Sequence, residues 1–247
     1  MGAAPAIRDG IPETEAVKAL FNRIAPVYDE LNDRLSLGLH HVWKQMTVSW
    51  CQPFPGAIAL DICCGSGDLA RLLAKQVGAS GQVIGLDFAR SQLDWAQKTT
   101  TPTPSTAPIT WIEGDATALP FDDSQFDSIT MGYGLRNVPD IAISLQEISR
   151  VLKPGAKAAI LDFHRPSWSI MQALQRTYLD QLVVPAAHQL GVEAEYAYIW
   201  PSLQRFPTGQ QQVELALNIG FYSAVHYEIA GGMMGVLVLQ TPPSSIC

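Results

Sequence analysis

The residues whose types and spacing best suit binding and chemistry lie in one glycine-rich turn. The stretch ALDICCGSGDLARLL starts at Ala59 and reads as a buried strand, a glycine turn and the start of a helix. Gly65, Gly67 and Ala70 fit the pattern G-x-G-x-x-G/A. Asp87 follows about 20 residues later, where dinucleotide-binding folds place a ribose-binding carboxylate. A nicotinamide-dependent oxidoreductase is therefore one interpretation of the turn.

Acidic side chains beside the turn argue against a diphosphate ligand. Asp61 ends the expected strand and Asp68 begins the expected helix. Each carboxylate would cost about 1–4 kcal/mol beside a diphosphate at surface-like dielectric constants. Asp68 alone is weak evidence because an acidic residue is favourable in the first turn of any helix. The pair better fits S-adenosylmethionine, which carries a sulfonium and an ammonium group and no phosphate. Asp61 is then expected to face its methionine end and Asp87 its ribose hydroxyls.

Length and composition predict an ordinary globular α/β protein. The chain has 247 residues, of which 47% are hydrophobic and 16% charged. Its net charge of −7, without a long Lys/Arg cluster, argues against binding to nucleic acid. No apolar run approaches the roughly 18 residues that a transmembrane helix requires. The N-terminal stretch MGAAPAIRDGIPE lacks the basic and apolar segments of a secretory signal. We therefore expect a cytoplasmic protein.

The cysteine pattern predicts neither a disulfide framework nor a metal site. Cys51, Cys63, Cys64 and Cys247 include no C-x-x-C pair and no Cys/His cluster at zinc spacing. Cys63 and Cys64 are adjacent in the expected turn, where ordinary disulfide geometry is not available. All four are expected to be reduced thiols, and no metal is expected.

Short apolar runs alternate with amphipathic stretches along most of the chain. Strands are expected at residues 57–63, 81–88, 109–116, 126–135, 156–163, 222–229 and 234–240. Helices are expected at residues 14–51, 68–78, 89–100, 141–153, 167–191 and 206–220. This alternation predicts an α/β fold with a doubly wound, mostly parallel, Rossmann-like sheet and an antiparallel C-terminal strand. Residues 1–52 are expected to form an N-terminal helical lid. Residues 53–247 are expected to form the main domain, with substrate-covering helices at about 164–212.

Two stretches resemble motifs of class I methyltransferases. DICCGSG is similar to their first motif, D-x-G-x-G-x-G, with Cys63 in place of the first glycine. EGDATALPF resembles their third-strand motif, which implies that Asp115 binds the adenine amino group beside the backbone of Ala116. The implied S-adenosylmethionine site consists of Asp61, Gly65, Ser66, Gly67, Asp87, Asp115, Ala116 and Gly132.

Longer stretches resemble the ubiquinone/menaquinone biosynthesis C-methyltransferase family. Residues 21–44, FNRIAPVYDELNDRLSLGLHHVWK, match its signature Y-D-x-M-N-x-x-x-S-x-G-x-H-x-x-W except at Leu31. RVLKPG at residues 150–155 resembles a second signature, GLRNV at 134–138 a substrate-side loop, and SLQRFP at 202–207 a C-terminal element. The resemblance covers nearly the whole chain after Thr14.

This resemblance implies methylation of a ring carbon on a prenylated or phytylated quinol. A neighbouring ring hydroxyl must lose its proton to make the carbon nucleophilic, which requires a base or a stabilising cation. Arg136, just after the fourth strand, is expected to supply that charge or to hold a water, with Asn137 beside it. Tyr28 is expected to come from the lid and orient the quinol. The alternatives are that Arg136 caps the next helix and that Tyr28 is structural.

Other polar residues near the expected site are left out of the catalytic set. His40 matches the signature, but a lone histidine is more often a packing residue. His164 departs from the family pattern, and a solvent-facing position is favoured over substrate contact. Asp162 ends the fifth strand and is expected to line the pocket.

A helical stripe raises the question of lipid contact. Trp168, Met171, Leu174, Tyr178 and Leu182 recur at helical spacing. A helix covering the sheet is favoured over a lipid channel. The expected partner is a lipophilic quinol, and peripheral membrane contact and a homodimer are further hypotheses.

The particular quinol is open at this stage. DICCGSGDLA and Gly132 resemble the form of the family found in oxygenic phototrophs, which implies the final ring methylation in phylloquinone biosynthesis. Demethylmenaquinone and ubiquinone-precursor methylation are the alternatives. A nicotinamide oxidoreductase and a non-catalytic binding protein are interpretations from other functional classes.

Overall fold

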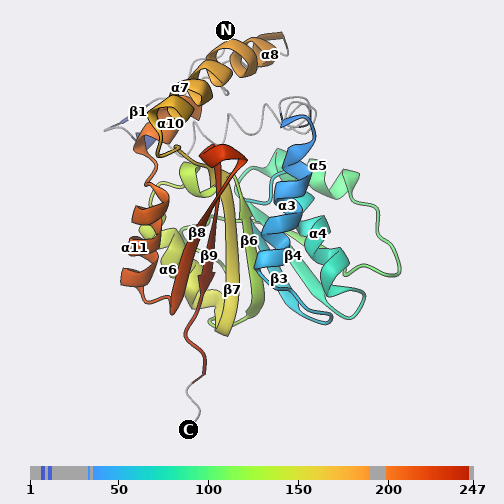
Figure 1. Ribbon diagram of the computed structural model, residues 1–247. Coiled ribbons are helices and arrows are strands. Elements are labelled where there is room, and N and C mark those ends of the chain that lie inside the picture. The colour runs from blue at the N-terminus through green and yellow to red at the C-terminus, as the bar shows by residue number, and fades with distance from the viewer. Residues whose placement is uncertain (1–6, 9–10, 13–32, 34–35, 190–198, 245–247) are drawn as a thin grey trace.

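A seven-stranded sheet forms the centre of the molecule (Figure 1). The computed structural model describes residues 7–8, 11–12, 33, 36–189 and 199–244. The strand order is β5-β4-β3-β6-β7-β9-β8. The strands are β3 (Ile58–Ile62), β4 (Gln82–Asp87), β5 (Ile109–Glu113), β6 (Phe126–Gly132), β7 (Leu152–Phe163), β8 (Ser223–Ile229) and β9 (Met234–Gln240). A separate antiparallel pair joins β1 (Ile7–Arg8) and β2 (Ile11–Pro12).

The pairing of the strands confirms the predicted fold class. The neighbours from β5 to β7 pair in parallel, whereas β9 is antiparallel to both β7 and β8. The strand order reverses beside β3, because β4 lies on one side of it and β6 on the other. In open α/β sheets, ligands bind at such a switch point, outside the carboxyl ends of the strands.

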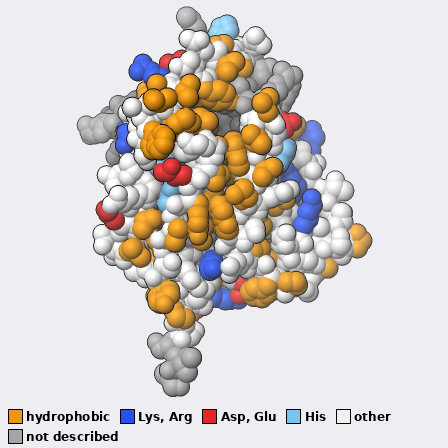
Figure 2. Space-filling model, in the orientation of Figure 1, with side chains coloured by type: hydrophobic (Ala, Val, Ile, Leu, Met, Phe, Trp, Pro, Cys, Tyr) orange, Lys and Arg blue, Asp and Glu red, His pale blue; other side chains and the backbone are white. Residues whose placement is uncertain are grey.

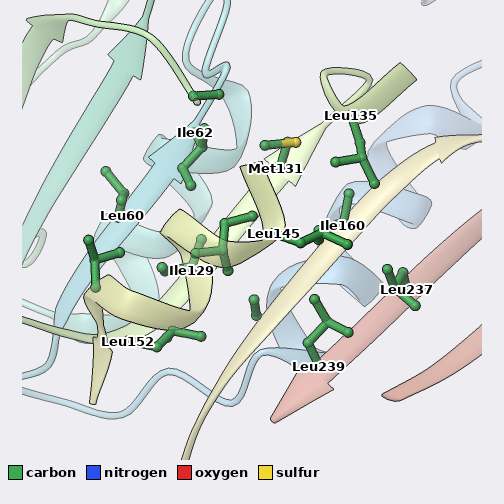
Figure 3. Close-up of a cluster of buried hydrophobic side chains, with 14 of the residues drawn as sticks. Leu60, Ile62, Ile129, Met131, Leu135, Leu145, Leu152, Ile160, Leu237 and Leu239 are labelled. Atoms are coloured by element: carbon green, nitrogen blue, oxygen red, sulfur yellow. The ribbon is translucent and has the colours of Figure 1, made fainter. Parts of the chain in front are cut away.

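Helices cover both faces of the sheet. The helices are α3 (Leu39–Trp50), α4 (Asp68–Val77), α5 (Arg90–Thr99), α6 (Ile141–Val151), α7 (Ser169–Tyr178), α8 (Val184–Gln189), α10 (Ile199–Arg205) and α11 (Gly209–Ile219). One core joins the sheet to α6 and α11, through side chains such as Leu145 and Ala216. Figure 3 shows Leu145 among strand residues that include Leu60 and Ile129. A second core joins the other face to α3 and α4, through Val48 and Leu73. Helix α3 therefore shares a core with the main domain. The expected boundary between a lid and the main domain near residue 52 stays a prediction.

The segment after β7 departs from the expected arrangement. Helix α7 continues through a π-helical turn, Leu179–Val183, into α8, and this run lies beyond one end of the sheet (Figure 1). The expectation that it covers a face of the sheet is therefore wrong. The physical reason is that its buried side chains, Leu179 and Val183, line a cavity beyond the strand ends.

Two further expectations are settled only in part. Helix α3 confirms the end of the predicted helix at 14–51, and residues 13–32 lie outside the described part of the chain. Cys51, Cys63 and Cys64 are free thiols, as expected, and Cys247 lies outside the described residues. Within those residues, none of the helices has the length and apolar character needed to cross a membrane.

Candidate active site

The glycine turn after β3 is shaped by three residues in the left-handed region. Gly65 and Gly67 have φ angles of +52° and +89°, and Cys63 has a φ of +54°. Cys63 thus adopts a conformation that a glycine takes more easily, at the position where the methyltransferase motif has its first glycine. Gly67 is also sterically required, because a Cβ there would lie 2.5 Å from Cη2 of Trp111.

A cavity of about 90 Å³ opens at this turn, and we call it the turn cavity. It lies at the carboxyl ends of β3, β4 and β6, beside the switch point. The predicted cofactor residues on its wall are Asp61, Gly65, Ser66, Asp87, Asp115, Ala116 and Gly132. Gly67, the remaining member of the predicted set, caps α4 and packs against Trp111 outside the wall. The structure therefore brings residues from four separate stretches of sequence to one site.

Two buried carboxylates hold the turn in place. Asp61 accepts hydrogen bonds from Ala70 N at 2.9 Å and from Thr130 Oγ1 at 2.8 Å. Asp87 accepts hydrogen bonds from Gly65 N at 2.8 Å and Ala89 N at 2.9 Å. Burial raises the pKa of Asp61 to about 7, against the opposing effect of its hydrogen bonds. A cation beside Asp61 would favour its charged form.

Asp68 has cationic partners within the protein. It accepts a hydrogen bond from Lys44 Nζ at 2.5 Å and another from Arg71. Burial acts to raise the pKa of Asp68, but Lys44 and Arg71 outweigh it and hold that pKa below its usual value. This corrects the expectation that Asp61 and Asp68 act together on a cationic ligand, because the charge of Asp68 is already neutralised. Lys44 lines the turn cavity and was missed from the sequence, although it ends the stretch that matched the signature.

The loop that carries Asp115 and Ala116 is fixed by the second signature. Arg150 donates hydrogen bonds to the carbonyl oxygens of Leu119 and Phe121 and to Glu147. Glu147 in turn accepts a hydrogen bond from Leu119 N at 2.7 Å. RVLKPG therefore acts on the site by positioning the loop, while Asp115 itself is exposed at the mouth of the turn cavity.

Arg136 lies behind the wall of the site, in a buried ion pair. Its Nε is 3.2 Å from Asp162 Oδ1, and its Nη1 donates to Ser202 Oγ at 2.8 Å. The guanidinium carbon also lies 5.2 Å from the centre of the Phe163 ring. Arg136 is therefore neither exposed nor a helix cap, and it lines neither of the two cavities described here. Ser202 belongs to the C-terminal element SLQRFP, which the fold brings to this arginine.

The other residues singled out from the sequence have mixed positions. Asn137 lines the turn cavity and donates to the carbonyl oxygen of Tyr133 at 2.9 Å. Tyr28 lies outside the described residues. Asp162 was expected to line the pocket, but it is buried against Arg136 and is not part of the wall of the turn cavity. His164 is also buried, which corrects the solvent-facing interpretation, because it packs 4.6 Å from the His226 ring and beside Glu228.

A second cavity, of about 350 Å³, adjoins the first, and we call it the apolar cavity. Both cavities have Tyr133 in their walls. Tyr133 has a φ of +59° and was not identified from the sequence, since neither its spacing nor its type marks it. His40 lies on the wall of the apolar cavity, with its Nδ1 2.8 Å from Ser36 Oγ. The apolar wall includes Leu39, Trp43, Phe163, Leu179, Val183, Ile199 and Met234.

Sequence comparison identifies close relatives over nearly the whole chain. A profile of the ubiE/COQ5 methyltransferase family matches residues 10–239. A Nostoc punctiforme protein named 2-phytyl-1,4-naphthoquinone methyltransferase is 59% identical over 227 residues, 92% of this chain and 99% of that one. The Synechocystis protein of the same name is 54% identical, over 93% of this chain and 96% of its own length. A chloroplastic Arabidopsis thaliana protein with an equivalent name is 51% identical over 90% of this chain and 85% of its own.

Solved structures share the fold at low sequence identity. A putative methyltransferase from Haloferax volcanii, in complex with the activator Trm112, superposes with a TM-score of 0.64 at 17% identity, covering 90% of this chain and 97% of its own. A methyltransferase from Thermotoga maritima that uses S-adenosylmethionine gives 0.61 at 17% identity, over 90% of this chain and 98% of that one. The fold thus agrees with the sequence match, and the chain belongs to the ubiE/COQ5 methyltransferase family.

Proposed function

We propose that this protein methylates a ring carbon of 2-phytyl-1,4-naphthoquinol, with S-adenosylmethionine as the methyl donor. The observation that carries the proposal is the junction of the two cavities at Tyr133. One is small and lined by carboxylates at the strand ends, and the other is larger and apolar. A charged nucleoside donor suits the first cavity, and a lipophilic quinol suits the second. The names of relatives at 51–59% identity support the naphthoquinone ring and the phytyl tail.

The turn cavity fits the donor better than it fits a dinucleotide. All three carboxylates line the cavity, which supports assigning Asp87 to the ribose hydroxyls and Asp115 to the adenine amino group; Asp61 is the most buried of the three. The Asp61 carboxylate on the cavity wall opposes a diphosphate at this position, whereas Asp68 does not, because Lys44 and Arg71 neutralise its charge. Gly132, also on the wall, packs closely against Leu69, because a Cβ there would lie 2.8 Å from Leu69 Cδ1. These contacts favour a nucleoside without phosphate.

The reaction needs a phenolate, exclusion of water, and a ring carbon aligned with the methyl group and the sulfur of the donor. The ionised ring hydroxyl pushes electron density into the ring, and the adjacent carbon forms a bond to the methyl carbon as the S–CH₃ bond breaks. The ring carbon then loses its proton to a water molecule, which restores the aromatic quinol, with S-adenosylhomocysteine as the second product. We propose that Arg136 acts through its charge from behind Phe163, and that Asn137 and Tyr28 orient the ring. The substrate must be the reduced quinol, because the methyl group is electrophilic and the oxidised quinone ring is itself an electrophile.

A lipid surface is the proposed source of the quinol. Leu37 and Leu39 line the apolar cavity and are 88% and 51% exposed. The helical run that lines this cavity through Tyr178 and Leu179 also carries exposed apolar side chains, and Figure 2 shows hydrophobic side chains gathered on this part of the surface. They include Trp168, Ile170, Leu174 and Leu182. Such side chains are suited to shallow insertion at a membrane surface, with the protein otherwise cytoplasmic. Absence of liposome binding at low salt would contradict this part of the proposal.

The test is methyl transfer to the quinol under anaerobic conditions. The purified protein is incubated with S-adenosylmethionine carrying a trideuterated methyl group and with reduced 2-phytyl-1,4-naphthoquinol. Mass spectrometry should show one labelled methyl group on the ring, and the oxidised quinone alone should give no product. Equal rates in both redox states, or faster methylation of a ubiquinone precursor, would refute the assignment.

A further inference from the structure

Lys44 is a buried cation on the wall of the turn cavity that the proposed mechanism has not used. Its residue exposure is 5%, and it reaches the cavity from α3. Among the residues that the structure describes, Asp68 is its side-chain hydrogen-bonding partner. A lysine ammonium carries three N–H donors, and burial without partners is costly for a charge. The position therefore suits an acceptor in the cavity.

The charges around Lys44 leave a cation for a ligand. Asp68 carries one negative charge and faces two cations, Lys44 and Arg71. Arg71 points away from the cavity, because its Nη1 donates to Ser66 O at 2.8 Å and lies near the hydroxyls of Thr99 and Thr100. Lys44 and Asp68 line the cavity, and Arg71 is not among the residues of its wall. This cluster therefore has one net positive charge, and Lys44 is its cation on the cavity wall.

Lys44 and Asp61 together present opposite charges on one wall. Both line the turn cavity, and they are close enough for Lys44 to lower the pKa of the buried Asp61 carboxyl against the larger effect of burial. A wall with one ammonium and one carboxylate matches an α-amino acid, whose own carboxylate and ammonium have the reverse arrangement. The methionine part of the donor has this chemistry.

We infer that Lys44 binds the carboxylate of the methionine part of S-adenosylmethionine, opposite Asp61. This inference rests on the proposed function and adds a specific contact within the donor site. The alternative is that Lys44 only joins α3 to α4 through Asp68. The two roles differ in one respect: a carboxylate-binding lysine distinguishes ligands with and without that carboxylate, and a purely structural lysine does not.

The experiment compares S-adenosylmethionine with its decarboxylated analogue, which keeps the sulfonium and the amine. Dissociation constants are measured by calorimetry for the wild type, Lys44→Met and Lys75→Met. Lys75 is exposed on α4 and serves as a control for loss of one positive charge. The wild type and Lys75→Met should bind the decarboxylated analogue about 10- to 100-fold more weakly, as expected for a lost charge-assisted hydrogen bond. In Lys44→Met this difference should disappear, because only the binding of S-adenosylmethionine weakens.

The outcomes separate the inference from the proposed function. Equal affinity of the wild type for both ligands overturns the inference without requiring any variant to fold. Equal weakening of both ligands in Lys44→Met also overturns it, and shows a structural role. If the wild type binds neither ligand, the proposed function fails first. Lys44→Arg should retain part of the discrimination, because it keeps the positive charge.

Discussion

Binding of S-adenosylmethionine should weaken as the pH falls, because Asp61 must be ionised to face a cation. Asp61 is fully buried and its pKa is raised to about 7 in the free protein. A bound ammonium or sulfonium group lowers that pKa again, so donor binding is coupled to release of a proton from Asp61. The test varies the pH across the pKa of Asp61 in the protein without bound donor. Asp61→Asn is the control, because an asparagine side chain does not titrate.

The size of the effect follows from the fraction of ionised Asp61. With a pKa of about 7, the carboxyl is roughly 90% ionised at about pH 8 and roughly 10% ionised at about pH 6. If only the ionised form binds well, the dissociation constant rises about tenfold between these two conditions. For stability the sign is the opposite, since the pKa is raised by folding. The contribution of Asp61 to stability is present below its unfolded pKa and is lost as the pH rises through about 7.

Calorimetry in two buffers of different ionisation enthalpy measures both the affinity and the protons released. The wild type should release close to one proton per donor bound near about pH 6. Asp61→Asn should bind weakly, with little change in affinity or proton release between the two conditions. A wild-type affinity that is constant with pH, or a pH dependence that persists in Asp61→Asn, would refute the assigned role of Asp61.

Three further changes test other parts of the site. Gly67→Ala should lower the free energy of unfolding, measured by urea titration, by about 2–4 kcal/mol, because φ is +89° and the new Cβ would collide with Trp111. The control Gly220→Ala has a φ of +116° and open space around the new Cβ, so it should lose only the stability that the unfavourable backbone conformation costs. Asp87→Ala should weaken binding of S-adenosylhomocysteine, measured by calorimetry, because the hydrogen bond to Gly65 N is lost, and unchanged affinity would contradict the role of this carboxylate. Arg136→Ala should lose turnover while donor affinity stays within about twofold of the wild type, and a parallel loss of donor binding would contradict its assignment to the quinol side.

Local motifs predicted most of the sheet and most of the carboxylates and glycines that line the turn cavity. The glycine turn, Asp87 and the loop at Asp115 each follow a strand, and the carboxyl ends of parallel strands meet at one edge of the sheet. Once the order of the elements is correct, these residues must therefore come together. The expected end of the helix at Gly220 is also confirmed, because Gly220 follows α11 with a φ of +116°, a conformation that favours glycine.

Pairs between distant elements could not be predicted in the same way. Asp68 alone resembles any acidic residue in a first helical turn, and only the packing of α3 against α4 shows that Lys44 neutralises it. Similarly, Arg136 lies next to a strand end, but its partner Asp162 comes from the adjacent strand and buries the charge. The burial of His164 depends on β8, which packs His226 against it.

The central claim is that the glycine turn recognises a positively charged nucleoside donor without phosphate. Its most direct test is titration calorimetry of the purified protein with S-adenosylmethionine, S-adenosylhomocysteine and NAD. The account predicts saturable one-site binding of the first two and none of NAD, since the Asp61 carboxylate on the cavity wall opposes a diphosphate. Binding of NAD without binding of either adenosyl compound would contradict it.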